Sequence, residues 1–491
     1  MAERAGFREI ALAVNLSTED HGGGDQSVLK YNDRRCRPPI QRASRAKPDG
    51  STDEADPPTV RFVVAGRCRD VTAVQFDAPM MVGGQAFSSI SFLMVIAESP
   101  GVKSISMNAT DARSGAAMLD VAAAEARIAA LDAPPRLDLL AHVRAAAAAG
   151  QRPIALMRVL GWTMRGPGRL TAGECFYYRL DGPGVTRDAA RRYVGKRRQS
   201  VFHMACNDVR WFAVAHDKAL FYAAARGSGL PTPHTLAVYA PGGRSLAAET
   251  LRTPRHLAAF LLRPECYPLF VKPIDGMYSV GALSLATLEG TTIRFSTGET
   301  ADADDVVRFI AGFSGEGYLL QRRLDPHPTL RQAFGSTLPT IRFLVLLSPA
   351  GATIESAVIK IPSPRNPADN YWRAGNMLGA LDGTGTVWRA ITGAGVTLRE
   401  MAEHPDTGAA LAGLAVPDWQ PAVDLCRHAA AMFPAIRTQS WDIALTDTGP
   451  AVLEFNFGGD LNLHQLAHRR GALTPTYVEH LRRCGYQRLK L

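Results

Sequence analysis

The sequence predicts an α+β protein, in which a strand-rich N-terminal region precedes a longer part of alternating strands and helices. Three observations predict this class. From about residue 255 onward, short apolar runs of strand type alternate with helical stretches. Residues 111–150 are rich in Ala with helical spacing, and Ala has the highest helix propensity. Residues 59–110 contain β-branched and apolar runs that Gly, Pro and Asp interrupt, as is typical of strands.

A chain of 491 residues exceeds what one hydrophobic core fills, so we expect several segments. Residues 1–58 mix both charges with Gly, Pro and Ser, which predicts disorder or a linker. For residues 59–134 the sequence predicts an N-terminal α/β region of unknown role. A helical region over 135–250 follows, and residues 251–485 form the domain that carries most of the candidate chemistry.

The net charge of +9 allows nucleic acid, an anionic surface or small anions such as nucleotides and sugar phosphates as partners. No basic helix is interleaved with aromatic residues, so we expect no nucleic acid. The seven Cys are scattered without a C-x-x-C pair, so neither a disulfide framework nor a thiolate zinc site is expected. No apolar run approaches the roughly 18 residues of a membrane span, and we expect a cytoplasmic protein.

The segment LFVKPIDGMYSVGALSL predicts a strand that ends near Lys272, then a loop and a second strand. The loop contains Gly276, Ser279 and Gly281. Glycines let backbone N–H groups approach phosphate oxygens, and a Lys on the strand supplies a positive charge. The alternative is a glycine hairpin beside a surface Lys, and this segment alone does not decide between the two.

Two predicted strands, WDIAL and AVLEFNF, flank the tight turn TDTG near the C-terminus. This hairpin brings Asp442 close to Glu454 and Asn456. Because Glu454 and Asn456 are two residues apart on one strand, they point to the same face. Three oxygen-bearing side chains on one face suit Mg²⁺ and leave positions for water and phosphate oxygens. The alternative is a polar strand that faces solvent.

Further cations are candidates for binding phosphate. Lys218 follows Asp217 at a predicted helix start, although a surface Lys is the alternative. Arg342 and Lys360 lie within otherwise apolar strands, where a cation is costly unless it pairs with an anion. Both are therefore candidates for nucleotide phosphates. The strand and connector at 318–324, YLLQRRL, could bind an adenine edge.

Together these features resemble the ATP-grasp superfamily, in order along the chain and over roughly residues 135–485. The matching features are Asp217-Lys218 with the Leu-Pro-x-Pro that follows, Val271-Lys272-Pro273 with its glycine loop, Gln321 to Leu324, Lys360, Asp442, Glu454 and Asn456. Within the superfamily the chain is similar to the sugar-transfer-associated group, which is related to α-L-glutamate ligases. The residues that support this are Pro326-His327-Pro328, Thr340-Ile341-Arg342, Asp369-Asn370, His404-Pro405, Thr407-Gly408, Gly413, Pro417, Trp419 and Trp441-Asp442.

The resemblance implies an ATP-grasp fold, in which two α+β subdomains clamp ATP, and makes residues 251–485 the nucleotide-binding and catalytic domain. It implies ATP and Mg²⁺ or Mn²⁺ as cofactors. The implied ligands are Lys218, Lys272, Gly276, Ser279 and Gly281 for phosphate, Gln321 and Leu324 for adenine, and Asp442, Glu454 and Asn456 for the metal. Gln321 stands where many relatives have Glu. Ser440 stands where some carboxylate ligases have Arg, so Arg342, together with Lys360, becomes the candidate catalytic cation.

The resemblance implies an ATP- and Mg²⁺-dependent ligase that activates a carboxylate as an acyl phosphate for attack by an amine. The expected setting is surface-polysaccharide or sugar-linked biosynthesis, with a small-molecule or sugar-linked acceptor and polysaccharide-assembly proteins as partners. Two alternatives stay open: a phosphotransferase that acts on a sugar precursor, and a non-catalytic nucleotide-binding accessory protein. The product separates the first two, and ATP binding without hydrolysis would favour the third.

Overall fold

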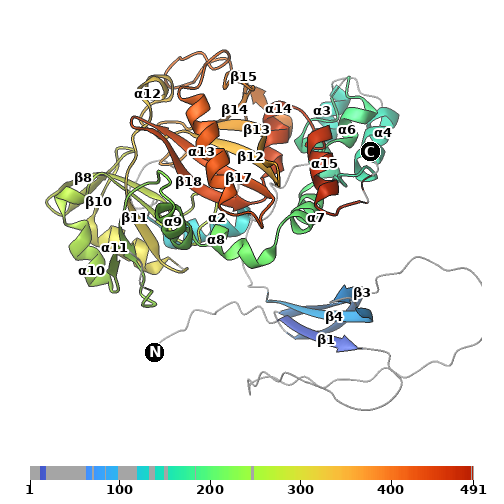
Figure 1. Ribbon diagram of the computed structural model, residues 1–491, viewed down its shortest axis with the longest axis horizontal. Coiled ribbons are helices and arrows are strands. Elements are labelled where there is room, and N and C mark those ends of the chain that lie inside the picture. Colours follow the sequence, from blue (N-terminus) through green and yellow to red (C-terminus); the bar gives the residue numbers. More distant parts are fainter. Residues whose placement is uncertain are drawn as a thin grey trace, which may run out of the picture. The chain divides into compact units, whose positions relative to one another are not determined.

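A computed structural model of the chain describes residues 12–17, 62–68, 71–82, 85–97, 119–131, 139–148, 153–182, 184–244, 248–313, 315–487 and 489. The chain divides into two compact units, Met1–Asp111 and Ala112–Leu491, which are described separately (Figure 1). The second unit contains all of the candidate site residues.

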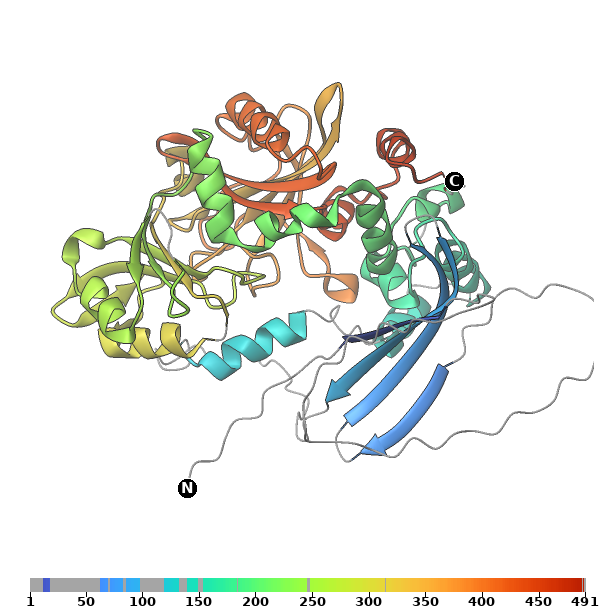
Figure 2. The same cartoon turned by 60° about the horizontal axis from the view of Figure 1, so that its bottom comes forward.

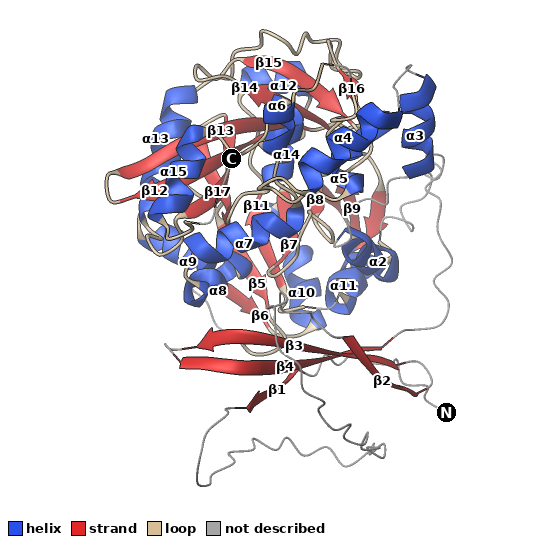
Figure 3. Cartoon of the chain, turned by 90° about the vertical axis from the view of Figure 1, so that its right-hand side faces the viewer, coloured by secondary structure: helices blue, strands red, loops and turns tan. Residues whose placement is uncertain are grey.

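The first unit contains a four-stranded antiparallel sheet in the order β1-β4-β3-β2 (Figure 3). Its strands are β1 (Leu12–Ser17), β2 (Phe62–Cys68), β3 (Val71–Val82) and β4 (Gln85–Ala97). The strand-type runs expected within residues 59–110 therefore lie in β2, β3 and β4. Apart from β1, the linker expected over 1–58 lies outside the described residues.

Helices form the first part of the second unit. They are α2 (Val121–Leu131), α3 (Leu139–Ala148), α4 (Pro153–Met164), α5 (Ala172–Tyr177), α6 (Arg187–Arg191), α7 (Lys196–Cys206), the 3₁₀ helix η1 (Val209–Trp211), α8 (Phe212–His216) and α9 (Lys218–Gly227). Asp217 is the N-cap of α9, because its side chain accepts the backbone N–H of Leu220. This cap fixes Lys218 in the first turn, where the sequence predicted a helix start.

The first of two seven-stranded sheets has the order β10-β9-β8-β7-β11-β5-β6, and only its β5–β6 pair is parallel. Its strands are β5 (Thr235–Tyr239), β6 (Glu249–Leu251), β7 (Leu269–Pro273), β8 (Leu283–Glu289), β9 (Thr292–Phe295), β10 (Thr300–Asp302) and β11 (Tyr318–Arg322). Helices α10 (Pro254–Leu261) and α11 (Ala303–Gly312) pack on one face with Val271 and Leu320, and η2 (Pro264–Cys266) follows α10. Lys272 and Gln321, the next residues on those strands, therefore lie on the other face.

The second sheet has the order β16-β15-β14-β13-β12-β17-β18 and is antiparallel throughout. Its strands are β12 (Thr340–Ser348), β13 (Gly351–Ile361), β14 (Met377–Leu381), β15 (Val387–Thr392), β16 (Arg399–Glu400), β17 (Thr438–Thr446) and β18 (Gly449–Phe457). The predicted hairpin with the turn TDTG is present, since Thr446 pairs with Gly449.

Helices cover both faces of this second sheet. Helix α13 (Trp419–Ala431) crosses one face (Figure 2) and packs with Ile359 and Trp441 in the main core. Helix α14 (Leu461–His468) packs on the other face over β13 to β15. The remaining helices are α12 (Pro328–Phe334), η3 (Gly395–Thr397) and α15 (Pro475–Arg483). On the side of α14, the part of the sheet formed by β12, β17 and β18 carries the charged residues described next.

Candidate active site

One face of the second sheet collects the charged side chains of neighbouring strands. Side chains alternate along a strand, and the aromatic residues between the charged ones pack against α13 in the core. The register places Arg342 directly across from Asp442, and Asp442 across from Glu454. The predicted hairpin thus brings two of the three proposed metal ligands side by side.

Asp442 is buried, with 3% of its surface exposed, and two cations neutralise it. Arg342 donates to both carboxylate oxygens, from Nε to Oδ1 at 2.8 Å and from Nη2 to Oδ2 at 2.7 Å. Lys360 Nζ lies 3.0 Å from Asp442 Oδ2 and 3.4 Å from Asp369 Oδ1. Burial alone would raise the pKa of Asp442, but Arg342 and Lys360 hold it well below its usual value. Both strand cations therefore have anionic partners, and these partners are protein carboxylates.

Helix α9 lies beside the edge strand β18 (Figure 1). Lys218 and Tyr222 are one turn apart on α9. Lys218 Nζ lies 3.4 Å from Glu454 Oε1 and donates a hydrogen bond to Gly276 O. Tyr222 Oη donates to Leu453 O at 2.6 Å. Leu453 is the residue at which the β17–β18 register shifts, so a bulge lies beside Glu454 and α9 fixes it. Helix α9 therefore ties the loop after β7 to the strand that carries the proposed metal ligands.

Lys272 lies on β7 near the carboxylates of the second sheet. Its Nζ donates to Tyr222 Oη at 2.8 Å and lies 4.9 Å from the centroid of the Tyr222 ring. Burial lowers the pKa of Lys272 to about 8, although the charges of Glu454 and Asp442 oppose this shift. Both carboxylates therefore act on Lys272, but their negative charge does not offset the effect of burial on its pKa. A phosphate group would supply that charge.

Side chains from the second sheet's connections hold the glycine loop after β7. Asn370 Nδ2 donates to Tyr278 O, and Arg373 Nη2 donates to Ser279 O at 2.9 Å. The backbone N–H groups of Gly276 and Ser279 donate no hydrogen bond to another residue that the structure describes. The loop therefore has occupied carbonyl groups and available N–H groups, as a phosphate-binding loop requires.

Gly281 closes this loop in a conformation that suits only glycine. Its φ is +78°, in the left-handed region. A Cβ atom at Gly281 would lie 2.8 Å from the Phe313 ring and 2.9 Å from Tyr318 Oη. The predicted need for glycine at this position thus has a local steric cause, in addition to any contact with phosphate.

Gln321 lies on the same face of the first sheet as Lys272, because Leu319, two residues earlier on β11, is directly across from Lys272. Gln321 is 1% exposed, and its Nε2 donates to Thr235 Oγ1 at 3.1 Å. Leu324 is half-buried in the connector after β11. Contact of Gln321 and Leu324 with adenine stays a prediction.

Asn456 lies across from Ser440 on the face of Glu454. Its side-chain Nδ2 is buried and has no hydrogen-bond partner among the described residues. Amide oxygen and nitrogen positions are assigned from hydrogen bonding, so a half-turn of this amide would place Oδ1 there instead. A buried polar atom without a partner points to a ligand, and an oxygen at this position would suit a divalent cation.

Two residues of this site were not found from the sequence. Tyr222 contacts Lys272 and stands four residues after Lys218, so helical spacing could have shown that the two side chains share one side of α9. Asp369 contacts Lys360 from a loop, and no local pattern signals that contact. Asp369 was predicted only as part of the family resemblance, with no role assigned to it.

Comparison with protein families decides which fold family this arrangement represents. The model of the family described as sugar-transfer associated ATP-grasp matches residues 197–480. The chain belongs to this family. Its two sheets with their covering helices form the ATP-grasp fold that the sequence predicted, and the N-terminal sheet lies outside the match. No helix in the described part of this ATP-grasp protein is long and apolar enough to cross a membrane.

Solved structures with which this ATP-grasp protein aligns are remote. The ADP complex of PurK, an N5-carboxyaminoimidazole ribonucleotide synthetase, is 13% identical with a TM-score of 0.30, and the alignment covers 51% of this chain and 46% of that chain. D-alanine-D-alanine ligase from Helicobacter pylori is 11% identical with a TM-score of 0.34, over 57% and 63% of the two chains. This chain therefore spans about half to two thirds of their lengths. A search of curated proteins found no match.

Proposed function

We propose that this protein is an ATP- and Mg²⁺-dependent ligase that activates a carboxylate as an acyl phosphate for attack by an amine. One observation carries the proposal: the Lys218–Glu454 salt bridge of 3.4 Å joins α9 to a proposed metal ligand, and Lys272 lies close enough to Glu454 and Asp442 for both charges to act on its pKa. A metal-bound triphosphate requires the same pattern, since cations bind its phosphate oxygens and carboxylates bind its metal.

The donor set fits a divalent cation. A carboxylate offers about four acceptor positions, and Arg342 and Lys360 use three of those on Asp442, which leaves one on Oδ1. The Glu454 side chain is 31% exposed, and the Asn456 amide has a buried atom without a described partner. Asp442, Glu454 and Asn456 would therefore hold the ion. When bound, Mg²⁺ would neutralise phosphate charge and polarise the transferred phosphoryl group.

Lys218, Lys272 and the loop of Gly276, Ser279 and Gly281 would bind the phosphates. Lys218 donates to Gly276 O and lies 3.4 Å from Glu454 Oε1, and an ammonium has three donors, so it can also donate to a phosphate oxygen. Glu454 keeps further acceptor positions for the metal. Lys218 would therefore lie between the phosphate site and the metal site.

Arg342 is the proposed cation for the transferring phosphoryl group, because Ser440 carries no charge at the position where some carboxylate ligases have Arg. A guanidinium has five N–H donors, and the contact with Asp442 uses two of them. Lys360 holds Asp442 and Asp369 in place from the next strand. Because these partners are buried and fixed, the positive charge is already oriented before the reaction begins.

For the acceptor, we propose a small molecule or a sugar-linked group, in surface-polysaccharide or sugar-linked biosynthesis and alongside polysaccharide-assembly proteins. The support is the description of the family as sugar-transfer associated. Because such an enzyme consumes ATP, we also propose a cytoplasmic location. Contact of Gln321 and Leu324 with adenine belongs to the same proposal.

A Mg²⁺-dependent ATP-binding titration tests the proposal, followed by a screen of acidic sugars and amino acids as carboxylate donors, with amines as acceptors. A ligase yields ADP, free phosphate and an amide, whereas a phosphorylated acceptor would show a phosphotransferase. Lys272→Ala should weaken ATP binding, and Asp442→Asn with Glu454→Gln should abolish turnover. Arg308→Ala, which removes an exposed cation on α11, is the control and should change neither. Full activity in either site variant would remove the corresponding assignment.

A further inference from the structure

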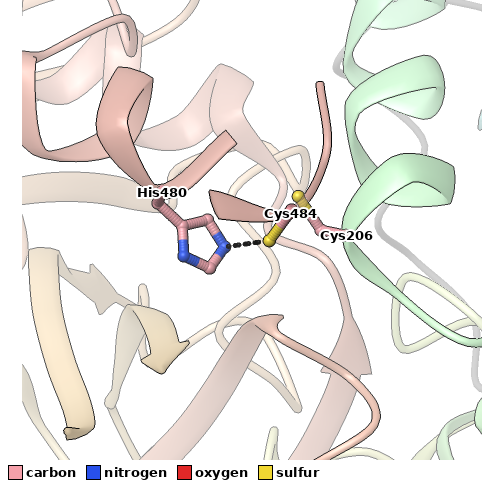
Figure 4. A group of neighbouring side chains, drawn as sticks. All are labelled: Cys206, His480 and Cys484. Carbon is pink, nitrogen blue, oxygen red and sulfur yellow. Dashed lines mark hydrogen bonds between the residues drawn. The ribbon is translucent and has the colours of Figure 1, made fainter. Parts of the chain in front are cut away.

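Two thiols and an imidazole meet beside the start of β17 (Figure 4). Cys206 is the last residue of α7, His480 lies on α15, and Cys484 is the C-cap of α15. The two Sγ atoms and one ring nitrogen of His480 all lie within 4.8 Å of one another. Cys484 Sγ lies 3.6 Å from His480 Nε2.

Protein contacts alone hold these three side chains in place. Cys206 is 1% exposed and His480 is 6% exposed. Arg437 clamps the two cysteines together, because its Nε donates to Cys206 O at 2.9 Å and its Nη2 donates to Cys484 O at 3.4 Å. His480 and Cys484 are four residues apart, which places them on one side of the helix end. The three ligand atoms are therefore oriented by helix geometry and by one half-buried guanidinium.

We propose that Cys206, His480 and Cys484 bind a zinc ion. Two thiolates and one imidazole are ligands that Zn²⁺ prefers. With Zn–S of about 2.3 Å and Zn–N of about 2.0 Å, tetrahedral coordination separates sulfur from nitrogen by roughly 3.5 Å. The observed separation of 3.6 Å between Cys484 Sγ and His480 Nε2 fits that geometry. Binding converts both thiols to thiolates and releases their two protons to solvent, with no change of oxidation state.

Three protein ligands leave one coordination position, and Thr438 lies next to it. Thr438 Oγ1 is 3.0 Å from His480 Nε2. Zinc would take the place of this hydrogen bond, because it needs the lone pair on Nε2. The freed Thr438 hydroxyl is then placed to hold a water in the fourth position.

The zinc site is separate from the proposed nucleotide site. Thr438 and Asp442 are four residues apart on β17, or about 13 Å along an extended strand. The ion would join α7 to α15 across the start of the strand that carries Asp442, so its role is to support that strand. Cys484 also lies beyond residues 197–480, which the family model matches, so membership of the family does not imply this site.

Metal analysis of the full-length protein, purified under reducing conditions, tests the site. We expect about one zinc per chain. After chelation, titration with Co²⁺ should give the visible absorption of a tetrahedral, thiolate-bound ion. Cys206→Ser and Cys484→Ser should lose both the zinc and the absorption. Cys266→Ser removes a buried thiol outside the cluster, in η2, and should keep both.

A second measurement on the unmodified protein covers the case in which the serine variants do not fold. Zinc should slow the alkylation of Cys484, the more exposed of the two cysteine ligands, and leave the alkylation of Cys266 unchanged, as read by peptide mass spectrometry. Three results would overturn the proposal: no zinc bound by the reduced protein, zinc retained by both serine variants, or a Cys206–Cys484 disulfide recovered in place of a metal-bound form.

Discussion

The half-buried side chain of Lys272 should make ATP binding sensitive to pH above neutrality. Its pKa of about 8 means that Lys272 in the free protein is mostly protonated at pH 7. At pH 9 only about a tenth of it is protonated. Because phosphate binding requires the charged form, the apparent dissociation constant should rise about tenfold between pH 7 and pH 9, or ~1.4 kcal/mol of binding free energy.

Isothermal titration calorimetry with Mg²⁺ and a non-hydrolysable ATP analogue measures this change. Proton uptake at pH 9 should appear as a dependence of the heat on the buffer. Lys272→Arg should remove the pH dependence, because a guanidinium stays protonated. Lys360→Arg is the matched control and should keep it, because the carboxylates of Asp369 and Asp442 outweigh burial and raise the pKa of Lys360 above this range.

Constant affinity between pH 7 and pH 9 would refute the assignment of Lys272 to phosphate, and so would an unaltered pH dependence in Lys272→Arg. A change in protein stability cannot produce this loss of affinity, because the contribution of Lys272 to stability changes with pH in the opposite direction. The pKa of Lys272 lies below its ordinary value of 10.5, so the unfolded chain binds more protons between pH 8 and 10.5. The contribution of Lys272 to the free energy of unfolding therefore rises with pH in that window, while affinity falls.

Three further predictions concern stability. Arg342→Ala leaves Asp442 with one cation and should lower the free energy of unfolding by about 3–5 kcal/mol in urea titrations. Arg308→Ala, which removes an exposed cation, should change this free energy little. Equal effects of the two substitutions would contradict the importance of the Arg342–Asp442 pair. The pKa of Asp442 is depressed, so its stabilisation is complete above its ordinary pKa of about 3.9 and is lost as pH falls through the folded value. Asp442→Asn should therefore show a shallower loss of melting temperature in acid, and an unchanged slope would argue against this pair. Gly281→Ala should cost about 1–3 kcal/mol by thermal unfolding, because its Cβ meets Phe313 at positive φ. Gly290→Ala, with positive φ but open space, should cost less.

The hairpin of β17 and β18 could be predicted because all of its signals are local. Alternating apolar residues define each strand, TDTG defines the turn, and the turn then fixes Asp442 across from Glu454. Strand alternation also predicts that Glu454 and Asn456 share a face. No information from distant parts of the chain was needed for either inference.

The partners of the strand cations could be predicted only as a class. The cost of burying a charge requires an anion beside Arg342, but it does not say which one. The sequence favoured a nucleotide phosphate, and in the structure both cations contact Asp442. The strand of Asp442, β17, lies next to that of Arg342 and two strands away from that of Lys360. Strand order decides this pairing, and strand order depends on tertiary packing that a single sequence does not display.

The cluster of Cys206, His480 and Cys484 escaped the sequence analysis for a related reason. Zinc sites are read from closely spaced pairs such as C-x-x-C, and this chain has none. His480 and Cys484 give only an i,i+4 pair, and the third ligand comes from a helix far earlier in the chain. Packing of α7 against α15 creates the group, and neither helix alone carries a pattern that signals it.

In the proposed nucleotide site, the balance of charges favours an anionic ligand. The cations Lys218, Arg342 and Lys360 each form a salt bridge with a carboxylate of the site. Lys272 alone among these site cations has no carboxylate within salt-bridge distance in the described residues, and burial lowers its pKa against the opposing charges of Glu454 and Asp442. A metal–triphosphate with net negative charge would supply the missing partner, whereas a neutral ligand would bury Lys272 further and lower its pKa more. We therefore expect the proposed site to favour anionic over uncharged ligands.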